Sequence, residues 1–330
     1  FDINTAFTDI QSQVVILNVF KGPRSVVHES MADVLKLVVM GDWGGLPFYP
    51  YYSPFEIATA KQLMKVSVKD GYEAVLALGD NFYYDGVVNE FDSRFQNTFE
   101  NVFNDDQFKS IPWYLVGGNH DHYGNITGQI EYSKHSHRWV FPNMWYKVQM
   151  LGNGFNVTIV MIDTVTLCGN TMQEGEQPNG DIDDATAQDQ LSFIETTLKE
   201  SEDSYVIVAG HFPVWSIAEH GPTQCLLEKL KPLLEKYKAT TYMCGHDHNL
   251  QHIRETNSTV EYFVSGAVDV VDPSMKHKDS IPQDSLQFYW ANILGLGGFA
   301  TLDATKSEMV LRFHSATGST LYKHSMLPRK

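Results

Sequence analysis

Residues 75–86 read VLALGDNFYYDG, an apolar run followed by a glycine and a polar residue that could bind a metal, and four other stretches share this form. Leu35–Met40 precedes GDWGG, Trp113–Val116 precedes GGNHDH, Tyr205–Val208 precedes AGHFPVW, and Thr241–Met243 precedes CGHDHN. Short apolar runs bounded by turn-forming residues are typical of buried strands. The five stretches therefore predict strands of an open α/β sheet, each followed by a polar loop.

Seven residues with metal-ligating side chains follow these runs: Asp42, Asp80, Tyr83, Asn119, His211, His246 and His248. Ligands in open α/β sheets bind in the crevice beyond the carboxyl ends of the strands, so one crevice is expected to collect all seven. Two cations about 3.5–4 Å apart clamp the attacking and leaving oxygens of a phosphoryl displacement when a carboxylate bridges them. Asp80 is the candidate bridge.

The donor types narrow the choice of metal. Imidazole nitrogens suit zinc, iron or manganese better than calcium. A phenol with a reference pKa of about 10 binds as phenolate only beside a strong Lewis acid, so Tyr83 favours one ferric ion. Taken singly, Asp42 is also typical of a turn, Tyr83 of a core aromatic and Asn119 of an Asx turn. Their coincidence across five strand ends favours the two-metal site.

The five blocks resemble the signature of the metallophosphoesterases, and Tyr83 narrows the resemblance to the purple acid phosphatases. Longer stretches resemble the tartrate-resistant acid phosphatases of animals over about residues 35–327, among them GNHDHYGN, GHFPVWSIAEHGPT, CGHDHNLQ and SGAVDVVDPS. The resemblance implies an α/β fold, a four-layer αββα sandwich of two mixed β-sheets. It also implies that residues 34–330 form a single metallophosphoesterase domain.

The resemblance implies roles for individual residues. The ferric site would take Asp42, Tyr83 and His248, the second site (Fe²⁺, Zn²⁺ or Mn²⁺) would take Asn119, His211 and His246, and Asp80 would bridge them. His120 and His220 match histidines that contact phosphate or handle protons, with Glu219 adjacent to His220, and Asp272 matches a position near the site. For His220 a purely hydrogen-bonding role fits equally well. Val268 and Asp269 stand where the family more often has glycine and asparagine, which predicts a reshaped edge of the pocket.

The cysteines and the glycosylation sequons indicate the cellular compartment of the protein. By resemblance Cys168 and Cys225 match a family disulfide, and Cys244 stays free. Glycosylation sequons occur at Asn125, Asn156 and Asn257. Disulfide and sequons together predict a secretory, lysosomal or secreted glycoprotein.

The amino-acid composition limits the kinds of molecule that the protein is expected to bind. The chain has 330 residues, 43% of them hydrophobic, and a formal net charge of −16, which argues against nucleic acid as a standing partner. No membrane span is expected, since the apolar segment 14–20 is too short to cross a bilayer and lacks the flanks of a signal peptide. Residues 1–33 form an extension of unknown role: an added strand, a propeptide remnant or a mispredicted extension. We expect a monomer.

Helices and strands alternate between the blocks. Helices are expected from Pro54 to about Lys69, over about residues 185–200, and over about 223–237 with Pro232 inside. After residue 260, strands are expected over 261–268, 299–304, 308–315 and 319–325.

The stretch 169–184 reads GNTMQEGEQPNGDIDD and predicts a long polar loop. By resemblance it lies where the family has a protease-sensitive repression loop above the active site. It holds five acidic residues: Glu174, Glu176, Asp181, Asp183 and Asp184. We hypothesise that the loop lowers activity and that an activating protease relieves it; a flexible solvated loop is the alternative.

These observations predict a binuclear acid phosphatase that hydrolyses phosphomonoesters, such as phosphoproteins, nucleotides or small phosphate esters. Metal-bound hydroxide would attack phosphorus, His120 would help to spread the developing charge, and His220 or solvent would protonate the leaving group. Two alternatives remain: a catalytically silent scaffold with the phosphatase fold, and a di-iron protein that generates reactive oxygen.

Overall fold

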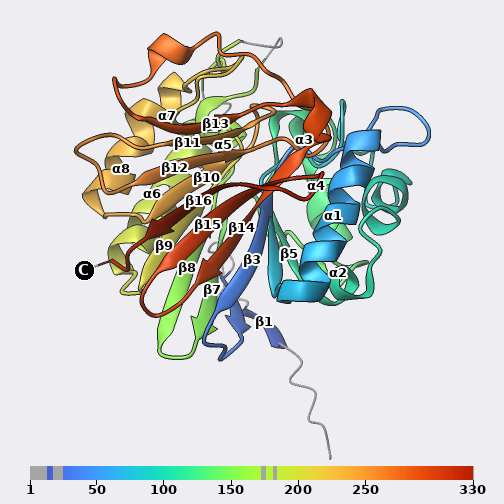
Figure 1. Cartoon of the computed structure of the whole chain (residues 1–330), viewed down its shortest axis with the longest axis horizontal. Coiled ribbons are helices and arrows are strands. Elements are labelled where there is room, and N and C mark those ends of the chain that lie inside the picture. Colours follow the sequence, from blue (N-terminus) through green and yellow to red (C-terminus); the bar gives the residue numbers. More distant parts are fainter. Residues whose placement is uncertain (1–12, 18–24, 172–175, 181–183, 330) are drawn as a thin grey trace, which may run out of the picture.

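Two β-sheets pack face to face, and helices cover the outer face of each, in the computed structural model of the chain (Figure 1). The structure describes residues 13–17, 25–171, 176–180 and 184–329. The predicted αββα sandwich of two mixed sheets is confirmed. No helix in these ranges is both long and apolar enough to span a bilayer.

The seven-stranded sheet carries three of the five predicted strand-and-loop blocks. Its order is β16-β15-β14-β3-β4-β5-β6, in which β3 to β6 are parallel and β14 to β16 antiparallel. The bounds are β3 Leu35–Met40, β4 Ala74–Ala77, β5 Trp113–Leu115, β6 Trp139–Val140, β14 Gly298–Ala304, β15 Met309–Ser315 and β16 Thr320–Met326.

The nine-stranded sheet carries the other two blocks, on the parallel neighbours β9 and β10. Its order is β1-β2-β7-β8-β9-β10-β12-β11-β13. The bounds are β1 Gln13–Leu17, β2 Ser25–Glu29, β7 Tyr146–Gly152, β8 Phe155–Met161, β9 Tyr205–Ala209, β10 Thr241–Cys244, β11 Leu250–Ile253, β12 Glu261–Ser265 and β13 Leu286–Trp290. Strands β1 and β2 come from residues 1–33, and β2 pairs in parallel with β7, so part of this segment adds to the sheet.

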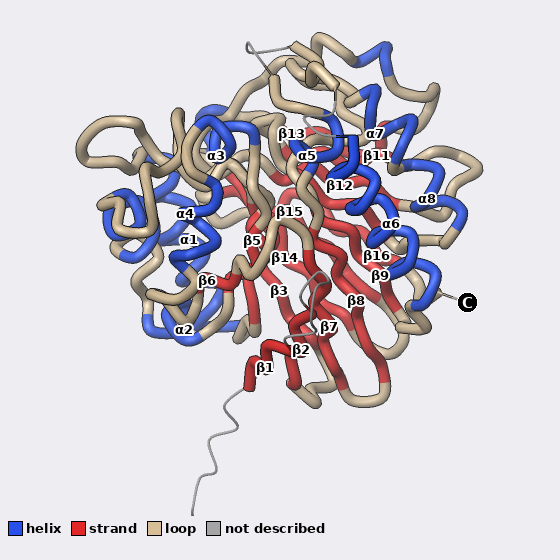
Figure 2. Tube along the Cα trace, turned by 180° about the vertical axis from the view of Figure 1, so that it is seen from behind, coloured by secondary structure: helices blue, strands red, loops and turns tan. Residues whose placement is uncertain are grey.

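The helices form two outer layers, seen from the opposite side in Figure 2. Beside the seven-stranded sheet lie α1 Pro54–Asp70, α2 Asp106–Ser110, α3 Asn119–Tyr123 and α4 Ile126–Tyr132, with a π-helix at Phe95–Glu100. Beside the nine-stranded sheet lie α5 Thr164–Cys168, α6 Asp184–Glu200, α7 Gln224–Lys229 and α8 Lys231–Lys236. Short 3₁₀ turns occur at Lys278–Ser280 and Ile293–Gly295.

Local sequence explains where two of these helices begin. Ser53 and Glu56 form a reciprocal capping box at the start of α1, because each side chain accepts a hydrogen bond from the backbone of the other. The single helix predicted over 223–237 is wrong: the chain breaks at Leu230 into α7 and α8. Pro232 lacks the N–H that a continuous helix would need, and it is tolerated because it lies in the first turn of α8.

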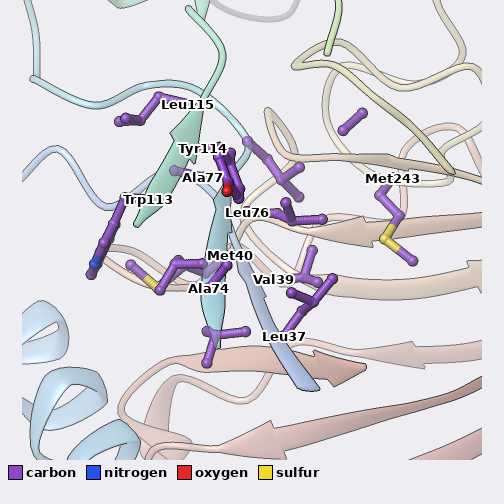
Figure 3. Packing of buried hydrophobic residues seen from close by; sticks show 14 of the residues in the cluster. Leu37, Val39, Met40, Ala74, Leu76, Ala77, Trp113, Tyr114, Leu115 and Met243 are labelled. Carbon is purple, nitrogen blue, oxygen red and sulfur yellow. The ribbon is translucent and has the colours of Figure 1, made fainter. Parts of the chain in front are cut away.

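Two apolar cores hold the layers together. The larger one includes strands of both sheets, and Figure 3 shows Leu37 and Val39 of β3 in the same cluster as Met243 of β10. The second core fills the space between the nine-stranded sheet and its helices. Trp43, one residue after Asp42, is fully buried among five aromatic rings, those of Phe82, Phe99, Phe103, Trp113 and Trp139. This packing fixes the loop that carries Asp42.

Candidate metal centre

The loops after β3, β4, β5, β9 and β10 meet at one edge of the sandwich. Backbone hydrogen bonds tie them together: the N–H of Asp42 donates to Gly79 O at 3.0 Å, and that of Gly245 donates to His211 O at 3.1 Å. The seven predicted ligands thereby come from both sheets into one crevice, as expected for strands whose carboxyl ends share an edge.

Three of the seven residues have a left-handed backbone although they carry a side chain. The φ angles are 58° at Asp42, 50° at Asp80 and 71° at His246. Such conformations cost of order 1–3 kcal/mol each and persist only where the surrounding structure enforces them. Their concentration in one crevice is typical of a functional site.

Three donor side chains form a first group at one side of the crevice. The Tyr83 hydroxyl lies 3.2 Å from Asp42 Oδ1 and 3.0 Å from His248 Nε2. His248 Nε2 is in turn 3.4 Å from Asp42 Oδ1. Asp42 is fully buried and also accepts hydrogen bonds from the N–H of His246. The three donor atoms are therefore close enough together to face a single cation.

A second group lies beside the first and includes Asp80. His211 Nε2 is 2.9 Å from Asn119 Oδ1 and 3.4 Å from Asp80 Oδ2. Ligand atoms of Asp80, His211 and His246 lie within 4.8 Å of one another. The other imidazole nitrogen of His211, Nδ1, donates to Leu78 O at 2.9 Å, which orients Nε2 toward the crevice.

The electrostatics of the crevice suit cations. Although burial opposes ionisation of Asp80, the neighbouring His211 and His120 lower its pKa below the usual value. Burial and the carboxylates of Asp42 and Asp80 raise the pKa of Tyr83 well above 10. Burial, together with the surrounding histidines, lowers the pKa of His246, so its imidazole is neutral and free to ligate. A phenol held among carboxylates loses its proton only if a strong positive charge balances them.

Two glycines make room for the carboxylates. A Cβ built on Gly118 would lie 2.2 Å from Asp80 Oδ1, and one built on Gly245 would lie 2.2 Å from Asp42 Oδ2. Any side chain at either position would displace the carboxylate. Two carboxylates, a phenol, an amide oxygen and three imidazoles thus converge in two groups, and this donor set fits two metal ions.

The predicted reaction residues lie around this centre. The N–H of His120 donates to Asp80 Oδ1 at 3.1 Å, its Nδ1 donates to Tyr84 O at 2.7 Å, and its ring packs 4.9 Å from that of Tyr83. His220 packs against His246 with ring centroids 4.0 Å apart and the rings tilted by 34°, and its Nδ1 donates to Asp247 Oδ1 at 2.9 Å.

Asp272 is tied to the same loop through its backbone. Its N–H donates to His248 O at 2.8 Å, while its carboxylate accepts from the N–H of Ser274 at 2.9 Å and so stabilises a turn. Glu219 pairs with Lys276 Nζ at 2.8 Å. Of the two acidic residues, only Asp272 bonds directly to a loop that carries a ligand, and its part in the reaction stays a prediction.

Several supporting residues escaped the sequence reasoning. Asp121 is fully buried and accepts from the N–H groups of Asn81, Phe82 and Gly118, so it holds the loops after β4 and β5 together. Arg94 donates to the carbonyls of Tyr83 and Gly44. Asp247 lies between the candidate ligands His246 and His248, which offered a signal for it, but no sequence pattern around Arg94 marks that residue as part of the site.

Val268 and Asp269, which differ from the residues more common in the family, lie next to the first group of candidate ligands. Both side chains are buried, and the N–H of Asp269 donates to Asp42 O at 3.0 Å. Burial raises the pKa of the Asp269 carboxyl to about 6, and Oδ1 has no hydrogen-bond partner among the described residues. A reshaped edge of the pocket stays a prediction.

The predicted loop 169–184 contacts the backbone of two site residues. Asn170 Nδ2 donates to Asn119 O at 3.1 Å, and Gln177 Nε2 donates to His220 O at 3.3 Å. Of its five acidic residues, Glu176 and Asp184 are exposed, while Glu174, Asp181 and Asp183 lie outside the described residues.

The predicted disulfide is confirmed: Cys168 of α5 is bonded to Cys225 of α7, and Cys244 is a buried free thiol. It closes a chain segment of 57 residues that includes loop 169–184.

Comparison with known proteins gives a consistent result. Residues 35–250 match the model of the calcineurin-like phosphoesterases. The chain is 46% identical to tartrate-resistant acid phosphatase type 5 of Oryctolagus cuniculus over 92% of this chain and 93% of that one. It is 44% identical to the protein of that name in Homo sapiens, over 93% and 96% of the two chains. The solved structure of GAP50, the anchor in the inner membrane complex of Plasmodium, shares the fold, with a TM-score of 0.75, 21% identity and 90% of both chains covered.

Proposed function

Because the chain belongs to the calcineurin-like phosphoesterase family, alongside the tartrate-resistant acid phosphatases, we propose that it is a binuclear-metal acid phosphatase that hydrolyses phosphomonoesters. One observation carries the proposal: seven donor side chains from five strand ends meet in two neighbouring groups, the second of which includes Asp80. We propose Fe³⁺ at Asp42, Tyr83 and His248, with Fe²⁺, Zn²⁺ or Mn²⁺ at the other group.

When bound, the two cations would supply Lewis acidity and an acidic water at the phosphorus atom. The residues of the chain would orient the ester and move protons. His120 is held by Tyr84 through Nδ1, which leaves Nε2 available for an oxygen of the phosphoryl group. Its backbone N–H also fixes Asp80, so one residue would couple substrate position to the bridging carboxylate.

His220 is the proposed proton donor to the leaving group. Its Nδ1–H is held by Asp247, which leaves Nε2 to carry and release the second proton. Burial opposes ionisation of Asp247, but the hydrogen bond and charge of His220 outweigh it and lower the pKa of this carboxyl. A histidine can release its second ring proton only after it has taken one up, and proton uptake by imidazoles is favoured as the pH falls. This supports turnover in the acid range.

Loop 169–184 is the proposed restraint on this activity. Its contacts with the backbones of Asn119 and His220 connect it to both the second metal group and the proposed proton donor. Cleavage by a protease within the loop is expected to raise turnover, while Cys168–Cys225 keeps the two cut ends joined. Unchanged kinetics after a clean cut would contradict this part of the proposal.

The setting is proposed to be the secretory pathway, with a lysosomal or secreted product acting as a monomer. The Cys168–Cys225 disulfide supports an oxidising compartment. Sequon residues Asn125 and Asn257 are exposed, and Asn156 is half-buried. A mass decrease on enzymatic removal of N-linked glycans would test the sequons, and sedimentation would test the monomer.

The deciding experiment measures metal content and p-nitrophenyl phosphate hydrolysis on one purified sample across pH 4 to 8, with and without tartrate. We expect two metals per chain, iron among them, and acid turnover that tartrate does not inhibit. Asp80→Asn should lose metal and turnover, whereas Asp303→Asn, which alters an Asp paired with Arg312 on β15, should keep both. Two metals without turnover would favour the scaffold, and an iron pair producing reactive oxygen would favour the redox role.

A further inference from the structure

A second cluster of metal-ligating side chains joins the two sheets away from the centre described above. His252 of β11 and Glu261 of β12 belong to the nine-stranded sheet, and His324 belongs to β16, the edge strand of the other sheet. Glu261 is the first residue of β12, whereas Gly266, beside Asp42, follows its last residue. The cluster therefore lies at the opposite end of this strand, roughly 17 Å from Gly266 at about 3.3 Å per residue.

The donor atoms of the three residues already face one another, with one histidine at each oxygen of Glu261. His252 Nε2 is 2.8 Å from Glu261 Oε2, and His324 Nε2 is 3.1 Å from Glu261 Oε1. One ligand atom from each residue lies within 4.8 Å of the other two. Ligands bound to zinc at about 2.0–2.1 Å in a tetrahedron are roughly 3.3 Å apart, so only small side-chain movements separate this arrangement from a coordinated one.

The surroundings orient the ligands. Tyr322 Oη lies 2.9 Å from His252 Nδ1, and Phe263 stacks on the His252 ring at 4.3 Å. With a cation on Nε2, His252 would keep its proton on Nδ1 and donate it to Tyr322, which is the outer hydrogen bond that ligating histidines use. His324 is 21% exposed, so water can complete the coordination and the ion has a path from solvent.

The protonation states also suit a cation. Burial lowers the pKa of His252, which keeps this imidazole neutral. Burial opposes ionisation of Glu261, yet the hydrogen bonds from His252 and His324 lower its pKa to about 2. Arg254 is the opposing charge, with Nε 3.5 Å from Glu261 Oε1, but its side chain is 47% exposed and is free to turn toward solvent.

We propose that His252, Glu261 and His324 form a third metal site, which takes a zinc-class divalent cation and links strand β16 to the nine-stranded sheet. Two imidazoles and one carboxylate are a ligand set that binds zinc in other proteins, with the fourth position left to water. The ligands come from three strands and both sheets, so a cation there would act as a cross-link within the sandwich. The site shares no residue with the phosphatase centre.

The test uses the intact metalloenzyme with its catalytic metals in place. Wild type, His324→Asn and Glu261→Gln are incubated with Zn²⁺, desalted and analysed for zinc per chain. His137→Asn is the matched control, because it removes an exposed imidazole elsewhere on the surface. Wild type and the control should each hold one more zinc per chain than the two site variants, and zinc should raise the thermal midpoint only where the site is intact.

Crystals of the wild type soaked in Zn²⁺ give a readout that does not depend on any variant folding. An anomalous peak at the zinc edge among the three ligand atoms would support the proposal. Equal zinc content in all four proteins, or crystals without that peak, would overturn it and leave the cluster as a hydrogen-bonded ion pair. Neither result depends on phosphatase activity.

Discussion

Replacing Arg94 with alanine should loosen the loops that carry the first group of candidate ligands. Arg94 is 7% exposed, and its guanidinium donates to Tyr83 O at 2.5 Å, to Gly44 O at 2.6 Å and to Thr98 Oγ1 at 3.2 Å. Gly44 O also accepts from the N–H of Tyr83. The guanidinium therefore links the loop after β3 to the loop after β4.

The size of the effect follows from what the substitution leaves behind. Arg94→Ala leaves the buried Tyr83 carbonyl without this partner, which costs about 1–3 kcal/mol, and removes one of the two hydrogen bonds to Gly44 O, which costs about 1 kcal/mol, so the free energy of unfolding should fall by about 3 kcal/mol. That is a large share of the ~5–15 kcal/mol available to a typical domain. Arg94→Lys keeps a charge but cannot form the fork, and should lose about half as much. Arg312→Ala, which breaks a half-buried pair with Asp303, should cost under about 1 kcal/mol.

Urea unfolding of the metal-free proteins measures these differences without a contribution from metal binding. Metal retained by the intact enzymes after dialysis then reports on the position of Tyr83, and Arg94→Ala should lose metal faster than Arg312→Ala. If Arg94→Ala unfolds within about 1 kcal/mol of wild type and keeps its metal, the guanidinium does not organise these loops.

Three further outcomes are expected. Removing the disulfide in a Cys168→Ser, Cys225→Ser double variant frees a 57-residue segment and should lower the free energy of unfolding by about 4 kcal/mol; a urea midpoint equal to wild type would contradict this. Glu261 has a pKa of about 2 in the folded protein against an ordinary value of 4.5. Its ionised carboxylate therefore contributes fully to the free energy of unfolding above pH 4.5, and this contribution is lost as the pH falls toward 2. In urea denaturation with zinc removed, the difference in free energy of unfolding between wild type and Glu261→Gln should therefore shrink as the pH falls from 4.5 to 2. A constant difference would contradict this prediction. Asp247→Asn weakens the hold on His220 and should lower acid turnover roughly tenfold with metal content retained; unchanged turnover would remove His220 from the proton path.

The strands and the loops that follow them were predictable because the pattern that specifies them lies within a few neighbouring residues. An apolar run followed by Gly and a polar residue specifies both a buried strand and a polar loop at its end, and the structure brings the seven candidate ligands from these loops together. The start of α1 at Pro54 was also predictable, since Ser53, Pro54 and Glu56 stand within four residues.

Other features depend on partners far along the chain. Arg94 is 50 residues from the Gly44 carbonyl to which it donates, and His324 is 63 residues from Glu261. No local sequence pattern therefore predicts either contact. The break at Leu230 had a visible cause in Pro232, but the apolar spacing on both sides continued through it and favoured one helix. Strand β2 could not be assigned because its pairing with β7 lies more than 100 residues away.

Gly118 and Gly245 limit which sequences can form the metal centre, although neither glycine is a candidate ligand. Neither offers an atom to a metal, yet alanine at either position would push a carboxylate from its place. In a comprehensive mutational scan, these glycines should score as intolerant as Asp80 and Asp42 themselves, although they carry no functional group. A map of such intolerance would therefore outline the space that the two carboxylates occupy as well as the residues that carry them.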